Sequence, residues 1–294
     1  MKGRILPPSL TPWLFLVGPL IIYMLWVIGP MIYTFYLSLT KWDGLTEPVF
    51  TGFRNFTRLF RDPVFYITLR NNAVWLVVFI TIPIILGLAL AMILNRDVPG
   101  AKFFKSAFYS PMVLSLVVCG LIWSWMYNPA QGLINNALRA VGLDHLTQGW
   151  LSDPKLALGS VINVAIWRQV GYVMILYLAG LQGVDPFLVE AGKVDGASAW
   201  QRFRHIIIPQ LQPITIVVIV ISIIDSLRSF DLVSVMTRGG PFNQTSVLAN
   251  FMYIQAFNNY RMGYGSAIAI ILFLLSLIFI VFYLANIAKN YDSF

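Results

Sequence analysis

The 294-residue chain is poor in charged residues, in cysteine and in histidine. Only 11% of its residues are charged, against about 25% in an average soluble protein, which excludes an ordinary soluble domain. Its one cysteine, Cys119, has no partner within the chain for a disulfide. Its two histidines, His145 and His205, are far apart in sequence and lack further candidate ligands, which argues against a zinc site. A Gly-x-x-x-x-Gly-Lys-Ser/Thr phosphate loop is also missing, so the chain is not expected to hydrolyse ATP itself.

Long hydrophobic stretches take the place of the missing charge. The chain is 58% hydrophobic, with a mean hydropathy of +0.76. Four uncharged runs exceed the roughly 20 residues that cross a bilayer: residues 5–40, 71–95, 106–138 and 262–288. Two less pure runs, at about 156–181 and 209–235, contain charged residues. We therefore expect an all-α, polytopic membrane protein with six transmembrane helices, the first of which is retained because it is too long for a signal peptide.

The formal net charge of +8 comes from basic residues scattered among short loops. They form no patch, so we expect membrane lipid and no nucleic acid as a partner. Six spans place both termini on one side. If that side is the cytoplasm, the inner and outer segments carry equal numbers of basic residues, and the outer loops include Lys41, Arg54, Arg58 and Arg61. The distribution of positive charge alone does not fix the orientation.

A polar segment between the fourth and fifth spans predicts two short helices. Asp185 before Pro186 supplies a side-chain acceptor at an N-cap and a proline at the first helical position. Asp195 and Gly196 signal a break. Ser198 then caps a second helix.

In this second helix the apolar residues Trp200, Phe203 and Ile207 recur at three- and four-residue steps, and Arg202 and Arg204 occupy other faces. The segment is therefore expected to be a helix-turn-helix knob that is apolar on one side and cationic on the other. A simpler alternative is an amphipathic helix lying on lipid. That alternative gives no reason for the spacing of Glu190, Gly196 and Pro209.

The run Glu190-Ala-Gly-Lys-Val-Asp-Gly196-Ala-Ser, followed by Ile206-Ile-Ile-Pro209, resembles the "EAA" coupling loop of permeases of binding-protein-dependent ABC importers. Gly192 stands where the family usually has alanine. The resemblance implies a cytoplasmic coupling loop at residues 185–209 that contacts an ATPase subunit. The implied coupling residues are Glu190, Ala191, Gly192, Asp195, Gly196, Ala197, Phe203 and Pro209.

Polar residues inside the fifth span fall on one helical stripe. Ser222, Asp225, Ser226 and Ser229 recur at i, i+3, i+4 and i+7. Because charge inside a membrane is costly, we expect this stripe to face a cavity. Arg228 lies three residues from Asp225, and an ion pair between the two is the structural alternative.

The fourth span carries a second polar face with Gln169 and Tyr172, and Arg168 is one turn from Tyr172. Amide, hydroxyl, carboxylate and aromatic groups together suit a neutral polyhydroxy ligand. The predicted substrate path therefore consists of Gln169, Tyr172, Ser222, Asp225, Ser226, Arg228 and Ser229.

Both ends of the chain carry a second resemblance. The segments Thr237-Arg-Gly-Gly-Pro241 and Gly263-Tyr-Gly-Ser-Ala267, with Pro12-Trp-Leu-Phe and Gly52-Phe-Arg-Asn-Phe, resemble carbohydrate-type permeases of the MalF, LacF and UgpA kind. This resemblance covers almost the whole chain. It implies the type I ABC importer permease (MetI-like) fold, with a cytoplasmic N-terminal tail at residues 1–12 and a six-helix permease domain at residues 13–294.

The same resemblance implies three kinds of protein partner in a bacterial cytoplasmic (inner) membrane, with both termini cytoplasmic. They are a second permease subunit (MalG- or UgpE-like), two ATPase subunits (MalK- or UgpC-like) that bind ATP and Mg²⁺, and an extracytoplasmic solute-binding protein. We expect no cofactor in this chain. The expected solute is a sugar, an oligosaccharide or a glycosyl-polyol compatible solute.

Three alternatives remain. One is a permease for glycerol-3-phosphate or its diesters, although a phosphate would need several convergent cations. Another is an intramembrane enzyme that uses Asp225 and Asp231 as acid and base. Their six-residue spacing places them on different faces of a continuous helix. The third is a passive channel, which would not need a coupling loop.

Overall fold

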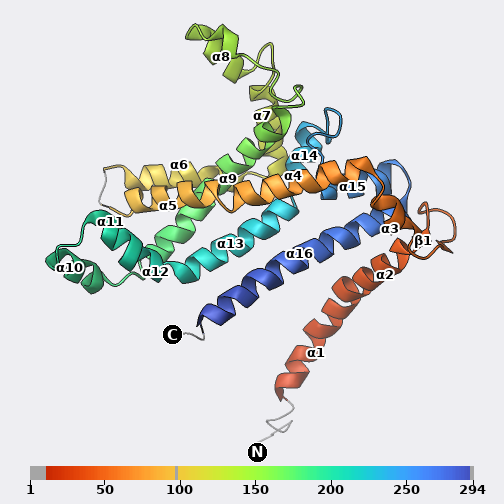
Figure 1. Cartoon of the computed structure of the whole chain (residues 1–294), viewed down its shortest axis with the longest axis horizontal. Helices are drawn as coiled ribbons and strands as arrows, with labels where there is room; N and C mark the ends of the chain where they lie inside the picture. The colour runs from red at the N-terminus through yellow and green to blue at the C-terminus, as the bar shows by residue number, and fades with distance from the viewer. Residues whose placement is uncertain (1–10, 97–98, 292–294) are drawn as a thin grey trace, which may run out of the picture. The chain divides into compact units, whose positions relative to one another are not determined.

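The computed structural model describes residues 11–96 and 99–291. Most of the predicted N-terminal tail therefore lies outside the described residues. The chain divides into two compact units (Figure 1). Unit 1 is Met1–Asp62 with Met252–Phe273, and unit 2 is Pro63–Phe251 with Leu274–Phe294. The fold is mostly helical, as predicted.

Unit 1 begins with one uninterrupted apolar helix. It consists of α1 (Thr11–Tyr23), the π-helical turn η1 (Met24–Ile28) and α2 (Gly29–Ser38). Two short strands follow, β1 (Thr40–Lys41) and β2 (Val49–Phe50), which pair antiparallel. Next comes α3 (Arg54–Leu59).

The loop between β1 and β2 is held by one carboxylate. Asp43 Oδ1 accepts hydrogen bonds from the Thr46 N–H (2.9 Å), the Leu45 N–H (3.0 Å) and the Thr46 hydroxyl (2.8 Å). These bonds, the Thr46 N–H foremost, lower the pKa of Asp43 to about 2. The carboxylate is therefore charged throughout the physiological range.

The C-terminal part of unit 1 returns to this strand pair. It comprises the π-helical turn η4 (Ile254–Asn258) and the start of α16 (Met262–Tyr291). The Gly263 N–H donates to the Trp42 carbonyl at 3.2 Å. A Cβ on Gly263 would overlap the Thr40 carbonyl oxygen, so this close approach requires glycine.

Unit 2 contains the remaining helices. In chain order they are α4 (Pro63–Phe79), α5 (Ile82–Leu94), α6 (Ala101–Val113), α7 (Leu116–Met126), α8 (Leu133–Ala140), the 3₁₀ turn η2 (Asp144–Leu146), α9 (Ala157–Leu181), α10 (Pro186–Val194), α11 (Ala199–Arg202), the π-helical turn η3 (Phe203–Ile207), α12 (Ile208–Gln210), α13 (Gln212–Leu227) and α14 (Asp231–Met236). The helix α15 (Leu248–Tyr253) runs from unit 2 into unit 1.

The helix α9 is the centre of unit 2, because α5, α6, α13 and α4 all pack against it. Where α6 crosses α9, a Cβ on Gly171 would overlap the Phe108 carbonyl oxygen. Where α5 crosses α9, a Cβ on Gly87 would lie 2.6 Å from Val173 Cγ1. In a bilayer, close contact of this kind between small residues replaces the hydrophobic effect as the force that holds helices together.

Four helices are long and apolar enough to cross a membrane: Phe15–Ser38, Pro63–Leu94, Ala157–Leu181 and Met262–Tyr283. The number rises to six if each of two bent helix pairs is one span. The four long helices agree with predicted spans, although the second begins at Pro63 instead of residue 71.

The third predicted span, residues 106–138, corresponds to a bent pair of helices. Here α6 and α7 meet at a bend of 102°. Pro111 lies in the last turn of α6, the backbone at Leu114 and Ser115 is extended, and Ser115 caps α7 by accepting from the Val118 N–H at 3.3 Å. The C-terminal part of the predicted run belongs to a turn and to α8.

The fifth predicted span, at about 209–235, begins at a bend. The segment Ala199–Gln210 meets Gln212–Met236 at an angle of 70°, and Pro213 lies in the first turn of α13. Within the span, residues 228–230 separate α13 from α14.

Candidate functional site

A cavity of about 320 Å³ lies in unit 2. The helices α4, α6, α7, α9, α13 and α14, with the joint between the last two, contribute its lining: Trp75, Phe79, Met112, Leu116, Ala165, Arg168, Gln169, Asp225, Arg228, Ser229, Asp231 and Leu232. Its volume is at the lower end of the range for ligand pockets, about 300–1,000 Å³.

The charged groups of this cavity have defined partners. The Gln169 side-chain amide donates to Asp225 Oδ2 at 3.2 Å. Arg168 donates from Nε to the Leu114 carbonyl and from Nη2 to the Met112 carbonyl, both at 3.4 Å. These carbonyls lie at the α6–α7 bend, where helical hydrogen bonding is interrupted. Arg168 thus supplies donors to backbone acceptors that the bend leaves without helical partners.

Asp225 and Arg228 do not form an ion pair, which the sequence analysis gave as the alternative to a ligand-binding role for Asp225. Within the described part of the chain, the ion pair closer than 4.0 Å is Lys193–Glu190. The helix α13 ends at Leu227, and Arg228 has left the helical conformation with ψ at 16°. The three-residue spacing therefore does not place the two side chains on one helical ridge.

The argument that separated Asp225 from Asp231 is wrong. A six-residue spacing divides two side chains between faces only in a continuous helix. Because the helix stops at Leu227 and restarts at Asp231, both carboxylates line the same cavity.

The predicted substrate path is brought together only in part. Gln169, Asp225, Arg228 and Ser229 line the cavity. Three other predicted residues do not line it. Tyr172 is half-buried elsewhere on α9, and Ser222 and Ser226 are fully buried. The Ser226 hydroxyl donates to the Ile223 carbonyl at 2.8 Å, and the Ser229 hydroxyl to the Ser226 carbonyl at 2.8 Å.

The apolar wall of the cavity was missed in the sequence. It includes Trp75 and Phe79 from α4, whose rings lie 5.3 Å apart, with Met112 and Leu116 from the two sides of the α6–α7 bend. Trp75 is almost completely buried, and its indole N–H has no acceptor within the described residues. One feature of the sequence could have indicated this wall. Trp75 lies in the middle of an apolar span, where its indole N–H lacks an obvious partner, and buried tryptophans usually have one.

At the C-terminal end of α9 lies the predicted coupling loop. Its local structure is confirmed. The Asp185 side chain accepts from the Phe187 N–H at 2.8 Å, Pro186 begins α10, and α10 ends before Gly196. Gly196 has a φ of +76°, a conformation that glycine adopts without strain.

Ser198 caps α11 through a complete capping box. The Ser198 hydroxyl accepts from the Gln201 N–H at 3.2 Å, and the Gln201 side chain accepts from the Ser198 N–H at 2.7 Å. The helix expected after Ser198 is confirmed and runs from Ala199 to Gln210, with a π-helical turn at Phe203–Ile207 in its middle. Pro209 then lies in α12, which leads into α13.

Gly192 is buried where α10 packs against the second helix. A Cβ there would lie 2.8 Å from Ile206 Cδ1 and 3.4 Å from Arg202 Cγ. The two helices therefore approach closely at this position. Because the nearest atom is the flexible end of the Ile206 side chain, an alanine here would need only a small shift of that side chain.

The outer surface of α10 is apolar and exposed. Phe187 is 83% exposed and Val194 is 88% exposed. Trp200 on α11 is exposed as well, and its ring lies 5.3 Å from that of Phe203. Glu190 pairs with Lys193 at 3.4 Å on the surface, an arrangement that contributes little to stability. Ala191, Asp195 and Ala197 complete the loop around Gly196.

The helix α9 runs along unit 2 and ends at the predicted coupling loop. Its 25 residues span about 37 Å at 1.5 Å per residue, more than the roughly 30 Å of a hydrocarbon core. Figure 1 shows α10 and α11 together at one end of unit 2, and α8 beyond the far end of α7. The geometry is that of a membrane-spanning helical bundle with a central polar cavity and a projecting helical knob.

Comparison with known proteins agrees with this class. The family model "Binding-protein-dependent transport system inner membrane component" matches residues 5–289. A probable ABC transporter permease protein of Pyrococcus horikoshii is 39% identical over 272 residues, 92% of this chain and 93% of that protein. The trehalose/maltose transport system permease protein MalF of Thermococcus litoralis is 32% identical over 276 residues, 92% of each chain.

Among solved structures, a bacterial ABC transporter involved in alginate import matches with a TM-score of 0.83. The two chains are 22% identical, and the match covers 95% of each. At this identity the likeness shows the fold alone. Together with the family match, it confirms the predicted importer-permease fold. The chain belongs to the family of inner membrane components of binding-protein-dependent transport systems and is a transport subunit rather than an enzyme.

Proposed function

We propose that this chain is the permease subunit of an importer for a neutral carbohydrate or glycoside. The central cavity carries the argument. Its two guanidinium groups, Arg168 and Arg228, are matched by two carboxylates, Asp225 and Asp231, so its formal charge is zero. Amide and hydroxyl groups supply donors and acceptors for sugar hydroxyls. The rings of Trp75 and Phe79 offer apolar surface against which a sugar ring packs.

The name of a relative supports the same substrate class. MalF of Thermococcus litoralis is named for trehalose and maltose transport, and both sugars are uncharged disaccharides. Sugar, oligosaccharide or glycosyl-polyol solutes all have the chemistry that the cavity fits.

Glycerol-3-phosphate is the alternative solute. A phosphate needs several convergent cations. In this cavity Arg168 donates to two backbone carbonyls, and Asp225 and Asp231 oppose the remaining cation. The charge balance therefore favours a neutral ligand.

An uptake experiment separates these solutes. In proteoliposomes containing the assembled importer, radiolabelled disaccharide or glycosyl-polyol should accumulate when ATP is supplied, and glycerol-3-phosphate should not. Accumulation of glycerol-3-phosphate alone would refute the neutral-solute proposal. Identifying the ligand that co-purifies with the cognate binding protein would name the solute.

The energy comes from partner subunits, because this sequence has no phosphate loop. Two ATPase subunits of the MalK or UgpC kind would bind ATP and Mg²⁺ and receive the coupling loop. The exposed Phe187 and Val194 on α10 supply an apolar surface for that contact, and Glu190 a charge-assisted acceptor. Closure of the ATPases would move the loop and switch the cavity between the two sides of the membrane.

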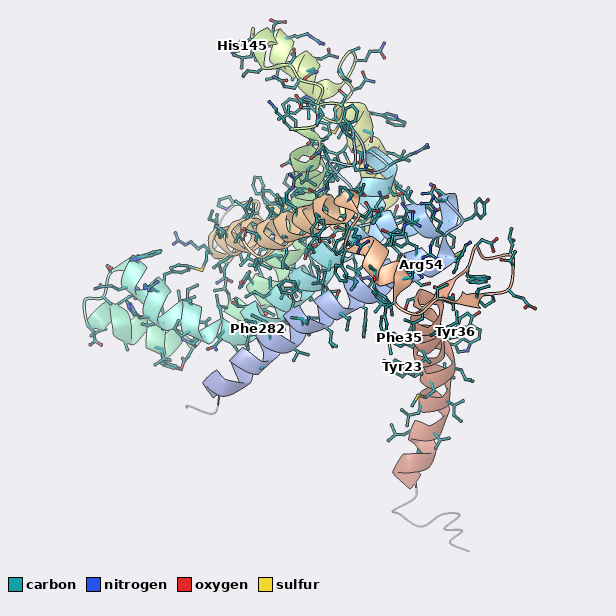
Figure 2. The ribbon with its side chains drawn as sticks, turned by 45° about the vertical axis from the view of Figure 1, so that its right-hand side comes forward. Tyr23, Phe35, Tyr36, Arg54, His145 and Phe282 are labelled. Carbon is teal, nitrogen blue, oxygen red and sulfur yellow. The ribbon has the colours of Figure 1, made fainter. Side chains whose placement is uncertain are left out.

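A second permease subunit of the MalG or UgpE kind would complete the bundle. The first span supports this partner, since its side chains are exposed along most of its length. Figure 2 shows Tyr23 projecting from it, and the neighbouring Leu25 and Trp26 are 66% and 77% exposed. An extracytoplasmic solute-binding protein would deliver the solute to the side opposite the coupling loop.

This proposal fixes the orientation: the coupling loop and both termini face the cytoplasm. In a background without Cys119, a cysteine at Asn136 or Asn243 should react with an impermeant thiol reagent added to intact cells. A cysteine at Ser198 should react only after permeabilisation. The reverse pattern would place the loop away from ATP and exclude this function.

A further inference from the structure

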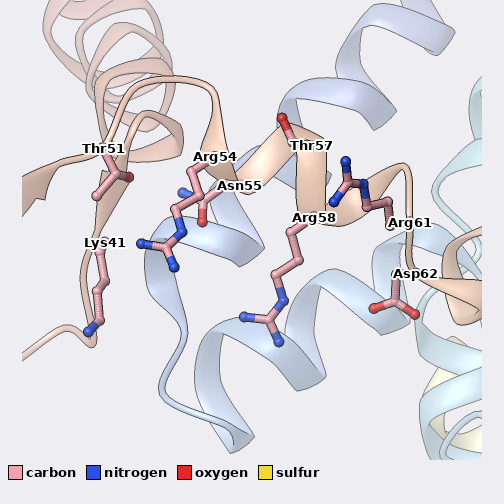
Figure 3. A pocket seen from close by; sticks show the side chains of 8 residues that line it. All are labelled: Lys41, Thr51, Arg54, Asn55, Thr57, Arg58, Arg61 and Asp62. Carbon is pink, nitrogen blue, oxygen red and sulfur yellow. The ribbon is translucent and has the colours of Figure 1, made fainter.

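Unit 1 contains a pocket of about 590 Å³ that the transport cycle described above does not use. The strand β1, the segment after β2, the helix α3 and the following turn form it. Its lining residues are Lys41, Thr51, Arg54, Asn55, Thr57, Arg58, Arg61 and Asp62 (Figure 3).

This pocket is strongly cationic. Three arginines, Arg54, Arg58 and Arg61, recur at i, i+4 and i+7 along α3 and the turn that follows it, and Figure 3 shows Lys41 on the neighbouring strand. The single carboxylate in the lining, Asp62, accepts a hydrogen bond from the Tyr264 hydroxyl at 2.9 Å. The four basic side chains outnumber the one carboxylate, so the pocket carries a net positive charge that suits an anion.

The scaffold of the pocket is fixed within unit 1. The Asn55 side-chain amide donates to the Ser38 carbonyl at 2.9 Å and to the Thr40 carbonyl at 2.7 Å. The Arg58 guanidinium lies 4.6 Å from the centre of the Tyr264 ring, a cation–π contact. These contacts attach α3 to the end of α2 and to the start of α16, and the cation–π contact holds the Arg58 side chain in place before a ligand arrives.

The pocket is adjacent to the ends of two candidate spans, Phe15–Ser38 and Met262–Tyr283. Where such helices cross a bilayer, their ends reach the headgroup region. Exposed phenylalanines flank α3: Phe53 directly precedes the helix and is 71% exposed, and Phe60 directly follows it and is 51% exposed. A short helix that combines cations with exposed aromatic rings is typical of a segment lying in a membrane interface.

We propose that this pocket binds the phosphate of an anionic phospholipid. A phosphodiester presents oxygens that accept paired hydrogen bonds from guanidinium groups. The helix α2 leading to the pocket exposes Ile32, Phe35 and Tyr36, which gives acyl chains an apolar surface next to the headgroup. A soluble anion or an acidic protein surface would have no use for that apolar surface. The proposal does not depend on which solute the protein carries.

The test compares lipid preference in the assembled importer. The complex is placed in nanodiscs of equal parts phosphatidylcholine and phosphatidylglycerol, and the lipids that remain bound after release are measured by native mass spectrometry. Wild type should retain phosphatidylglycerol preferentially. Replacing Arg54 and Arg61 by glutamine should lower this preference by about fivefold per cation removed.

Two control variants accompany this pair. Arg54→Lys with Arg61→Lys keeps the charge and should keep most of the preference. Arg139→Gln with Lys155→Gln removes two charges from the segment around α8 and should leave the preference unchanged. Folding is checked by monodispersity, and the single variant Arg54→Gln carries the test if the double variant is unstable.

Several results would overturn the proposal. An unchanged preference in the glutamine pair would do so, as would an equal loss in the Arg139 and Lys155 control. Displacement of phosphatidylglycerol by inorganic phosphate would indicate a site for a soluble anion. Normal lipid preference combined with weakened attachment of the solute-binding protein would indicate a protein-docking surface instead.

Discussion

At the scale of single residues, Asp225 is held by Gln169 and not by Arg228. The 3.2 Å hydrogen bond from the Gln169 amide leaves the other carboxylate oxygen available to a ligand in the cavity. Asp225→Ala should therefore abolish uptake while assembly and basal ATPase activity survive, because a lost buried hydrogen bond to ligand typically costs about 1–3 kcal/mol. Asp225→Asn keeps an acceptor for Gln169 and should retain part of the uptake.

The readouts for this prediction are the solute concentration at half-maximal uptake and the yield of intact complex. Failure of Asp225→Ala to assemble, with assembly restored in Asp225→Asn combined with Arg228→Gln, would show that the structural ion pair is the main role of Asp225.

Arg168 has a structural role that its sequence position did not reveal. It donates to the Leu114 and Met112 carbonyls, which the α6–α7 bend leaves without helical partners. Arg168→Leu should lower the stability of the purified complex by about 1 kcal/mol, since it removes two hydrogen bonds to backbone acceptors, one exposed and one partly buried. Arg168→Lys keeps a donor and should lose less. The measurement is the thermal unfolding midpoint in detergent, and an unchanged midpoint for the leucine variant would argue against this role.

At the scale of elements, the crossing of α6 and α9 depends on one glycine. A Cβ on Gly171 would overlap the Phe108 carbonyl oxygen, whereas a Cβ on Gly159 in the same helix meets nothing within 4 Å. Gly171→Ala should force the helices apart and reduce the yield of folded protein, at a cost of about 1–3 kcal/mol or more. Gly159→Ala is the matched control and should fold normally. Equal yields for both variants would contradict this close crossing of the two helices.

The coupling loop makes a comparable prediction. Gly196 has a φ of +76° and open space around its Cα, so its requirement is conformational and not steric. Gly196→Val should strain the turn by roughly 1–2 kcal/mol, weaken ATPase attachment and stop transport. Gly196→Asn should be tolerated, because asparagine adopts positive φ more readily.

The amount of ATPase subunit that remains with the permease during purification measures this effect. Glu190→Lys should reduce it as well, by placing like charge against the partner. Normal retention and normal uptake in both Gly196→Val and Glu190→Lys would support the lipid-lying helix instead.

Local sequence signals predicted this loop well and the cavity only in part. The caps at Asp185 and Ser198 and the break at Gly196 depend on neighbouring residues, which the sequence displays directly. The interruption between Leu227 and Asp231 follows no comparable local rule, since the run of Arg, Ser and Phe there includes neither glycine nor proline. Three members of the predicted stripe, Ser222, Asp225 and Ser226, do share the continuous part of α13, but Ser222 and Ser226 are fully buried and do not reach the cavity. Ser229 lies beyond the end of the helix and lines the cavity from the joint. Trp75 and Phe79 come from a span distant in sequence, and only tertiary packing brings them to Asp225.

At the scale of the whole molecule, the proposed function gives the two features of unit 2 different roles: the cavity holds the solute, and the knob of α10 and α11 receives force from an ATPase subunit. The sequence contains no phosphate loop, so the proposal takes its energy from partner subunits. A passive channel would let solute equilibrate without ATP, and would need no knob of α10 and α11. An importer permease accumulates solute only when partners act on it from both sides of the membrane.

The most direct test of this account is vectorial accumulation by the reconstituted complex. Proteoliposomes contain the chain with its second permease subunit and two ATPase subunits, with the solute-binding protein outside and ATP with Mg²⁺ inside. We predict that labelled glycoside accumulates above its external concentration only when both ATP and the binding protein are present. Equilibration of the glycoside without ATP, in vesicles that contain the permease subunits alone, would contradict the importer account.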